Sequence, residues 1–437
     1  MTAPRARQRK QMHLAAHFPG VNSTTVWTDP RSGSQTAFPS FRHLAATAER
    51  GLFDFFFLAE GLRLREHKGR IHDLDVVGRP ESITVLSALA AVTERIGLAA
   101  TVNTTFNEPY ELARRLASLD HLSGGRAAWN AVTSSDAFTG ENFRRGGYLD
   151  RAERYERAAE FVATARELWD SWTPEGVPRP FAHHGRHFSV SGTFDVARSP
   201  QGHPVVIQAG DSGEGREFAA SAADVIFTRH GTLEAGQAFY ADVKRRLPAY
   251  GRQPGDLKIM PGVTLVLGDT DAEAQEKAAG IRKQQVSPQN ALLALEQVWG
   301  RDLSGYDPDG PLPAIDPDPD GEVAQGRVRV ADPFAVAARW RALAEAKGLS
   351  IRQTVIETTG RQSFIGTPAS VAAQLDEFVT AGAADGFILI PHLTPGGLDD
   401  FVDRVVPLLQ ERGAFRTEYA GATLREHLGL PLPVWKP

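Results

Sequence analysis

Residues 205–216 read VVIQAGDSGEGR, and this stretch decides how we interpret the fold. The uninterrupted run 205–209 predicts a buried strand, a glycine-rich turn follows it, and a helix is expected from Gly215. Free N–H groups at the start of such a helix bind phosphate. The glycine spacing matches neither a dinucleotide-binding fingerprint nor a P-loop, so a tight turn without a ligand stays open as an interpretation.

The same alternation of strand and helix continues on both sides of this stretch. Further strands are expected at 11–16, 53–59, 97–102, 126–132, 225–228, 259–267 and 387–390. Helices are expected from Ser40 as a cap to a left-handed Gly51, at 81–93, 109–122, 233–250 and 398–411, and after the Thr367-Pro368 start signal. About eight strand–helix units predict an α/β fold of the closed (β/α)8 TIM-barrel type. An open doubly wound sheet is the alternative.

Two stretches do not fit this alternation, at about 136–196 and 269–361. Both are too long for ordinary barrel loops. We interpret 1–437 as a single barrel domain with these two insertions and a C-terminal extension at about 413–437. We expect the insertions to cover part of the site and to choose the substrate.

Composition excludes several classes of function. Hydrophobic residues make up 42% and charged residues 23% of the chain, which is typical of a globular protein. The net charge of −5 gives no signal for nucleic acid or a membrane surface, and no apolar run is long enough for a membrane span. There is no cysteine, which excludes disulfides and thiolate chemistry and fits a cytoplasmic protein. The clustered histidines lack a complete ligand set, so we expect no metal.

Polar residues gather where the predicted strands end, which is the face on which barrel enzymes place their sites. These residues are His17, Glu60, Asn103, Thr104, Asn130, Thr133 and Ser212. The set contains hydrogen-bonding groups and a candidate phosphate turn, but no nucleophile–base pair. Such a site suits a large polar cofactor that brings its own reactivity.

Several segments spread over nearly the whole chain are typical of one family. They are FDFFFLAEG at 53–61, NTTF at 103–106, LDHLSGGR at 119–126, WNAVTS at 129–134, Arg154-Tyr155, LWDSW at 168–172, the turn at 208–215, GTP at 366–368 and TLREHLGL at 423–430. In these segments the chain resembles the bacterial-luciferase-like flavin monooxygenases, in the branch of nitrilotriacetate monooxygenase, dibenzothiophene-sulfone monooxygenase and pristinamycin IIA synthase.

The resemblance implies a two-component monooxygenase that uses reduced FMN, supplied by a separate NAD(P)H:flavin reductase, and O₂ to oxygenate a small organic substrate. It places Asn103 and Thr104 near the flavin ring, Asn130 beside it, and Tyr155 and Ser212 toward the phosphate. It also suggests a homodimer or homotetramer. His17 is our candidate proton donor.

Three cofactor-binding positions depart from the family pattern. Glu60 stands where Asp is usual, Arg151 where a His precedes Arg-Tyr, and Asp211 where a Ser precedes Ser212. We hypothesise that Arg151 offsets the charge of Asp211. Two other functions stay open: an F420-dependent oxidoreductase on the same barrel, and a flavin-binding protein without catalysis.

Overall fold

A computed structural model describes residues 10–19, 24–60, 62, 80–134, 151–230, 232–321, 330, 332–358 and 363–436. Eight strands form a closed parallel barrel in the order β1-β12-β9-β8-β7-β4-β3-β2. They are β1 (His13–His17), β2 (Phe55–Leu58), β3 (Gly97–Asn103), β4 (Ala127–Val132), β7 (Val205–Ala209), β8 (Val225–Thr228), β9 (Lys258–Val263) and β12 (Gly386–Leu389). The predicted (β/α)8 barrel is confirmed, and the open doubly wound sheet is wrong because β1 pairs with both β2 and β12.

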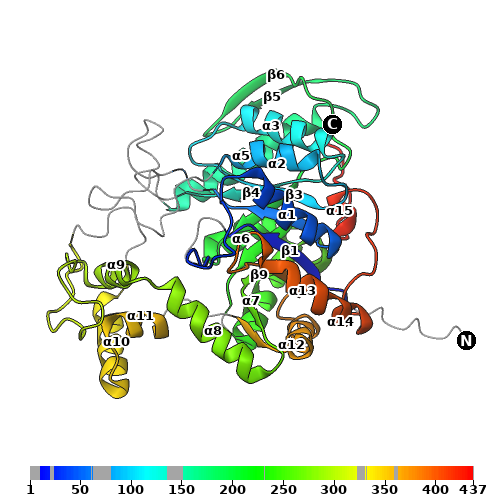
Figure 1. Ribbon diagram of the computed structural model, residues 1–437. Coiled ribbons are helices and arrows are strands. Elements are labelled where there is room, and N and C mark those ends of the chain that lie inside the picture. The colour runs from blue at the N-terminus through cyan, green and yellow to red at the C-terminus, as the bar shows by residue number, and fades with distance from the viewer. Residues whose placement is uncertain are drawn as a thin grey trace, which may run out of the picture.

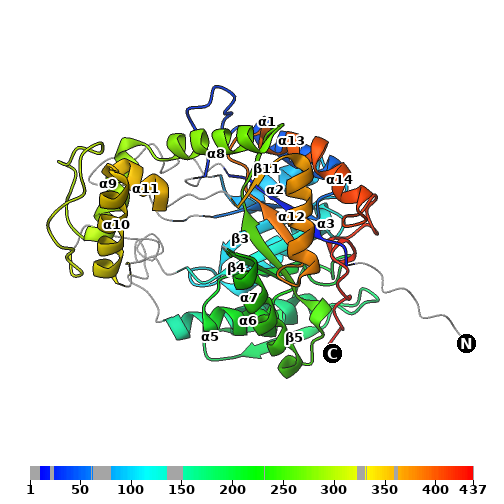
Figure 2. The same cartoon turned by 90° about the horizontal axis from the view of Figure 1, so that it is seen from below.

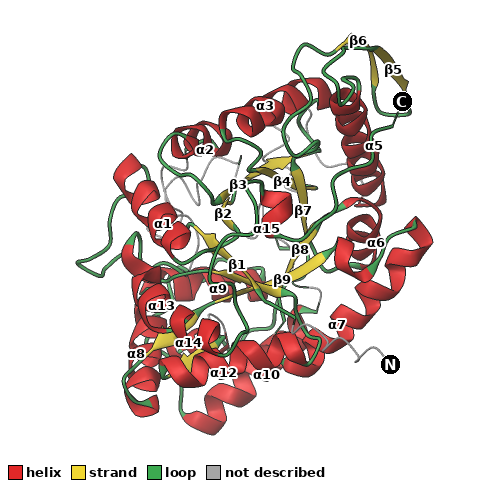
Figure 3. Ribbon diagram, turned by 90° about the vertical axis from the view of Figure 1, so that its right-hand side faces the viewer, coloured by secondary structure: helices red, strands yellow, loops and turns green. Residues whose placement is uncertain are grey.

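Helices surround the barrel (Figure 3). They are α1 (Phe38–Arg50), α2 (Ser82–Ala90), α3 (Pro109–Leu122), α5 (Arg151–Asp170), α6 (Gly213–Ala222), α7 (Leu233–Arg246), α12 (Pro368–Thr380), α13 (Asp399–Arg404) and α14 (Val406–Glu411). Two buried layers follow from this arrangement: one lies between the strands and the helices, and the other fills the barrel lumen. None of the helices in the described part of the chain has the length and hydropathy needed to cross a membrane.

Strand β2 shows why the strand sequences are uniformly apolar. Phe55 and Phe57 belong to the lumen cluster, whereas Phe56 and Leu58 belong to the outer layer. Successive side chains of a strand point to opposite faces, and here both faces are buried. The same alternation directs Asn103, Asn130 and His17 toward the lumen, because each lies an even number of residues from a lumen-facing alanine of its own strand.

The C-terminal extension closes one end of the barrel. Figure 3 shows the short helix α15 (Leu424–His427) inside the ring of strands. Leu424 and Leu428 pack in the lumen cluster. The buried Arg416 pairs with Asp54, just before β2, and the buried Arg425 pairs with Asp224 (Nη2–Oδ2 3.0 Å), just before β8. This is the end at which the strands begin, so the opposite end, where they finish, is the one available for a site.

The insertions add elements of their own. They are the hairpin β5 (Pro180–His184) and β6 (Ser189–Thr193), the helices α8 (Asp271–Gln285), α9 (Pro288–Trp299), α10 (Pro333–Lys347) and α11 (Ile351–Thr358), and the small parallel sheet of β10 (Leu265–Leu267) and β11 (Phe364–Gly366). Short 3-10 turns lie at Leu247–Tyr250, Pro254–Asp256 and Gly396–Leu398. Helices α9 to α11 share a core around Trp299 and Trp340. Figures 1 and 2 place these helices at the opposite end of the molecule from α15.

Three element predictions need correction. The predicted strand 259–267 is two strands in different sheets, β9 and β10. Helix α1 begins at Phe38 rather than after Ser40, since a Pro in its first turn already sets the helical φ. The predicted helix 398–411 is interrupted near Val405, because Pro407 cannot supply the backbone N–H that a continuous helix needs.

The glycine at position 51 has another role than the predicted left-handed cap. Its φ is −78°, and Leu52 takes the positive φ instead. A Cβ on Gly51 would lie 2.7 Å from Cγ2 of Val402, in α13. The glycine therefore allows α1 and α13 to approach closely.

Candidate functional site

The ends of strands β3 and β4 bring together two buried asparagines. Asn103 is fully buried, and Asn130 is 3% exposed. Asn130 Nδ2 donates to Thr101 Oγ1 (3.0 Å), and Asn103 Oδ1 accepts from the backbone N–H of Phe106 (2.8 Å). Each amide thus has one atom fixed by the protein.

The other atom of each amide lacks a hydrogen-bond partner within good geometry among the described residues. Asn103 Nδ2 and Asn130 Oδ1 are buried and make no hydrogen bond to the described residues. A buried donor or acceptor without a partner costs about 1–3 kcal/mol, so such atoms are rare unless a ligand or water satisfies them. Two on adjacent strands at the same end of the barrel indicate a ligand with complementary polar atoms.

Glu60 lies beside this pair, two residues after β2. Burial and the nearby charge of Glu81 raise the pKa of Glu60 to about 7, although polar contacts with Asn103 act in the opposite direction. A carboxyl with this pKa can hold a proton or release it near neutral pH.

His17 and aromatic rings form the other side of the lumen. His17, the last residue of β1, is buried, with its ring centroid 5.3 Å from that of Phe57. Phe57 stacks on Phe227 of β8 at 5.8 Å. A Cβ on Gly262 would lie 2.6 Å from the Phe227 ring, so glycine at this point of β9 makes room for that ring. The barrel mouth therefore has a polar side at β3 and β4 and an aromatic side at β2 and β8.

The turn between β7 and α6 lies on the same rim. Ser212 is the N-cap of α6, and its Oγ accepts from the backbone N–H of Gly215 (3.1 Å). The Tyr155 hydroxyl approaches from α5: a Cβ on Gly210 would lie 3.2 Å from it, and one on Gly215 3.0 Å. Residues far apart in the sequence thus meet at a helix N-terminus that favours an anion.

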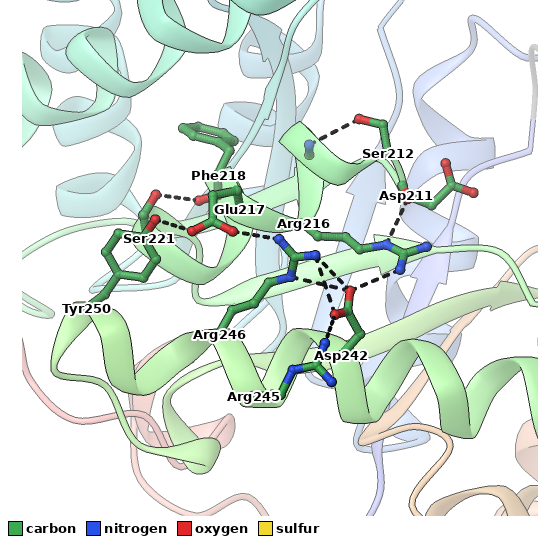
Figure 4. Close-up of polar contacts among 11 residues, drawn as sticks. Asp211, Ser212, Arg216, Glu217, Phe218, Ser221, Asp242, Arg245, Arg246 and Tyr250 are labelled. Atoms are coloured by element: carbon green, nitrogen blue, oxygen red, sulfur yellow. Dashed lines mark hydrogen bonds and ion pairs between the residues drawn. The ribbon is translucent and has the colours of Figure 1, made fainter.

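Charges around this turn are arranged as Figure 4 shows. Arg216 donates from Nε to the backbone carbonyl of Asp211 (2.9 Å) and from Nη1 to Asp242 Oδ2 (3.0 Å). The guanidinium of Arg216, close to the turn, is therefore already bound by Asp242. The Asp211 side chain is exposed, and Figure 4 shows its carboxylate turned away from Arg216.

Two predicted residues stand apart from these groups. Thr104 is fully buried, but its hydroxyl donates to the carbonyl of Val132 (3.3 Å), so it ties β3 to β4. Arg151 is the first residue of α5, and its side chain lies outside the described part of the chain, as does the suggested pairing with Asp211.

Three further polar residues lie at this rim, beyond those predicted from the sequence. Gln208 in β7 is 1% exposed and Thr228 in β8 is 3% exposed, and each has a buried oxygen, Oε1 and Oγ1, without a partner among the described residues. His230 follows β8, and its buried Nε2 also makes no hydrogen bond to the described residues. The pKa of His230 is lowered, mainly because burial disfavours the charged imidazolium. Thr228 and His230 could have been predicted as well, because they are polar residues at the carboxyl end of the predicted strand 225–228.

Comparisons with known proteins now place the chain. A model of the luciferase-like monooxygenase family matches residues 20–385. N-acetyl-S-(2-succino)cysteine monooxygenase of Bacillus subtilis is 40% identical over 98% of both chains. Component A of nitrilotriacetate monooxygenase from Aminobacter aminovorans is 42% identical over 90% of both chains. A crystal structure of riboflavin lyase with modified FMN and riboflavin is 29% identical, with a TM-score of 0.79 over 98% of both chains.

The chain belongs to the luciferase-like monooxygenase family, as the sequence resemblance predicted. It is an enzyme of the flavin-dependent monooxygenase class. The residues at the barrel mouth fit a flavin: unpaired amide atoms suit the polar edge of the ring system, aromatic rings suit its apolar edge, and the α6 turn suits a phosphate.

Proposed function

We propose that the chain is the oxygenase of a two-component system, which takes reduced FMN from a separate flavin reductase and oxygenates a small organic substrate. When bound, reduced FMN supplies two electrons to O₂, so that one oxygen atom enters the substrate and the other leaves as water. Asn103 and Asn130 carry the proposal most directly, because each has a buried amide atom without a hydrogen bond to the described residues, which favours a polar ligand in the lumen.

In this proposal the chain contributes binding, orientation and exclusion of water. Asn103 and Asn130 fix the ring by hydrogen bonds, and Tyr155 and Ser212 hold the phosphate at the α6 turn. Phe57 and Phe227 line the aromatic side of the mouth and keep water away from the reacting atoms.

Two groups can hold or move a proton during turnover. His17 lies buried against Phe57 in the lumen. Glu60 has a pKa raised to about 7, first by burial and then by the charge of Glu81. We propose His17 as the donor to the substrate side and Glu60 as a proton store beside Asn103.

We also propose that α8 to α11 act as a lid and select the substrate. Helices α9 to α11 have a core of their own around Trp299 and Trp340 and lie at the end of the molecule opposite to α15. A partly independent unit at the open end of a barrel can move relative to it and admit ligands. We retain a homodimer or homotetramer as the expected assembly.

Turnover assays test the proposed function. The purified chain is mixed with a flavin reductase, NADH, FMN and air, together with compounds that the relatives oxidise, such as nitrilotriacetate and N-acetyl-S-(2-succino)cysteine. Oxygenated product that needs both FMN and O₂ supports the proposal. Anaerobic turnover with F420 would replace it with a hydride-transfer function, and tight binding of oxidised FMN without any O₂-dependent product would favour a non-catalytic protein.

A further inference from the structure

At the α6 turn a negatively charged side chain stands where the proposed site would receive a phosphate. The exposed Asp211 directly precedes the cap residue Ser212, and its carboxylate has no ion pair among the described residues. Arg216 is the nearest cation along the chain, and Asp242 and a backbone carbonyl already bind its guanidinium. Asp242 in turn binds Arg245 (2.6 Å) and Arg246 (3.1 Å), so this network is closed without Asp211.

A second observation marks the turn as a ligand site. Gln208 is 1% exposed, and its Oε1 makes no hydrogen bond to the described residues. Its side chain lies directly under the turn: a Cβ on Gly210 would lie 2.8 Å from Gln208 Nε2, and one on Gly215 3.4 Å. Thr228 on the neighbouring strand also has a buried, unpartnered hydroxyl. Buried polar side chains in this state need a ligand or water.

We propose that Asp211 weakens the hold on the FMN phosphate and thereby keeps the flavin exchangeable. A phosphate at the α6 N-terminus gains from the helix dipole and the free N–H groups. A carboxylate one residue before the N-cap repels the same phosphate through partly screened solvent. This inference rests on the proposed function and adds the residue that sets the residence time of the flavin. A short residence suits an enzyme that receives reduced flavin from another protein and must release the oxidised form.

Flavin affinities with and without the phosphate test this inference. Dissociation constants for FMN and riboflavin are measured by fluorescence for the wild type, Asp211→Asn and Asp211→Ser, and anaerobically for reduced FMN. We expect both variants to bind FMN about three- to tenfold more tightly, with a slower off-rate, and to leave riboflavin affinity unchanged. The ratio of the FMN dissociation constants of wild type and variant falls toward one as the salt concentration rises, because salt screens the repulsion.

The control is Asp195→Asn, which removes the same charge from an exposed position after β6. Equal FMN affinity in wild type and Asp211→Asn at low salt would overturn the inference. So would an equal gain for riboflavin, because riboflavin has no phosphate to repel. If the wild type and all variants bind neither oxidised nor reduced FMN, the proposed function itself fails. This result differs from failure of the Asp211 inference alone, in which FMN binds equally to wild type and variants.

Discussion

Single residues at the barrel mouth combine burial with incomplete hydrogen bonding. Asn103 and Asn130 each satisfy one amide atom within the protein and leave the other without a hydrogen bond to the described residues. Their position at the carboxyl ends of β3 and β4 fits the proposed flavin site, where hydrogen bonds to a bound flavin would offset this cost.

Replacement of Asn130 tests this interpretation. We expect Asn130→Ala to weaken binding of reduced FMN about five- to thirtyfold, since one hydrogen bond to a buried polar ligand contributes about 1–2 kcal/mol. The measurement is anaerobic titration, with the melting temperature as the control for folding. Unchanged affinity in a folded variant would remove Asn130 from the flavin site.

The raised pKa of Glu60 predicts that the stability of the fold falls as the pH rises. Its pKa is raised from 4.5 to about 7 in the folded protein, first by burial. A raised carboxyl pKa means that its contribution to stability is complete below pH 4.5 and is lost as the pH rises through 7. Glu60→Gln should therefore match the wild type near pH 4.5 and exceed it above pH 8, by on the order of 1–3 kcal/mol. Melting temperatures of wild type and Glu60→Gln measured over this pH range test the prediction, and the exposed Glu418→Gln is the control. A stability difference between Glu60→Gln and wild type that is the same at all pH values would contradict it.

At the scale of elements, the strands and helices with strong local signals were predictable from the sequence. Strand 205–209, strand 225–228 and helix 109–122 have the predicted bounds, because unbroken apolar runs and a Pro start signal define them. The split between β9 and β10 was not predicted, because Thr264 alone is a weak signal in the otherwise apolar run 259–267, and tertiary pairing separates its halves.

The site was predictable only in part, because some of its features depend on tertiary contacts that no local sequence pattern encodes. Side chains at strand ends followed from topology, whereas Gln208 lies within a strand and becomes notable only because the fold leaves its Oε1 without a partner. The binding of Arg216 by Asp242 joins α6 to α7, and no local pattern encodes this contact.

Helix α15 should stabilise the barrel without contributing to flavin binding. Leu428 is fully buried in the lumen cluster at the end where the strands begin. We expect Leu428→Ala to cost about 2–5 kcal/mol and lower the melting temperature, while the dissociation constant for reduced FMN stays unchanged. Exposed Val434→Ala is the control. A large loss of flavin affinity in the folded variant would show that the two ends of the barrel are coupled.

At the scale of the whole molecule, buried carboxylates join the barrel to its C-terminal extension. Burial alone would raise the pKa of Asp54, but the charges of Arg416 and His13 outweigh it and lower that pKa to about 2. A lowered carboxyl pKa stabilises the fold above about pH 4, and this contribution is lost as the pH falls from 3.8 toward 2.

Removal of the basic partner should therefore have a pH-dependent cost. We expect Arg416→Met to destabilise the protein by about 3–5 kcal/mol at pH 7, because it leaves the Asp54 carboxylate buried without its main partner. The penalty should shrink below pH 4, where Asp54 takes up a proton. Chemical denaturation at several pH values measures it, with the exposed Arg339→Met for comparison. A penalty that grows in acid would contradict the assignment.

The central claim is that the barrel mouth binds reduced flavin and controls its reaction with O₂. Stopped-flow mixing tests it most directly: reduced FMN with the protein in excess, prepared without oxygen, is mixed with aerated buffer while the visible absorbance of oxidised FMN is followed. We predict that this absorbance returns in a delayed, slow phase that is absent without protein and faster in Asn130→Ala. Reoxidation at the rate of free reduced FMN, at protein concentrations well above that of the flavin, would contradict the account.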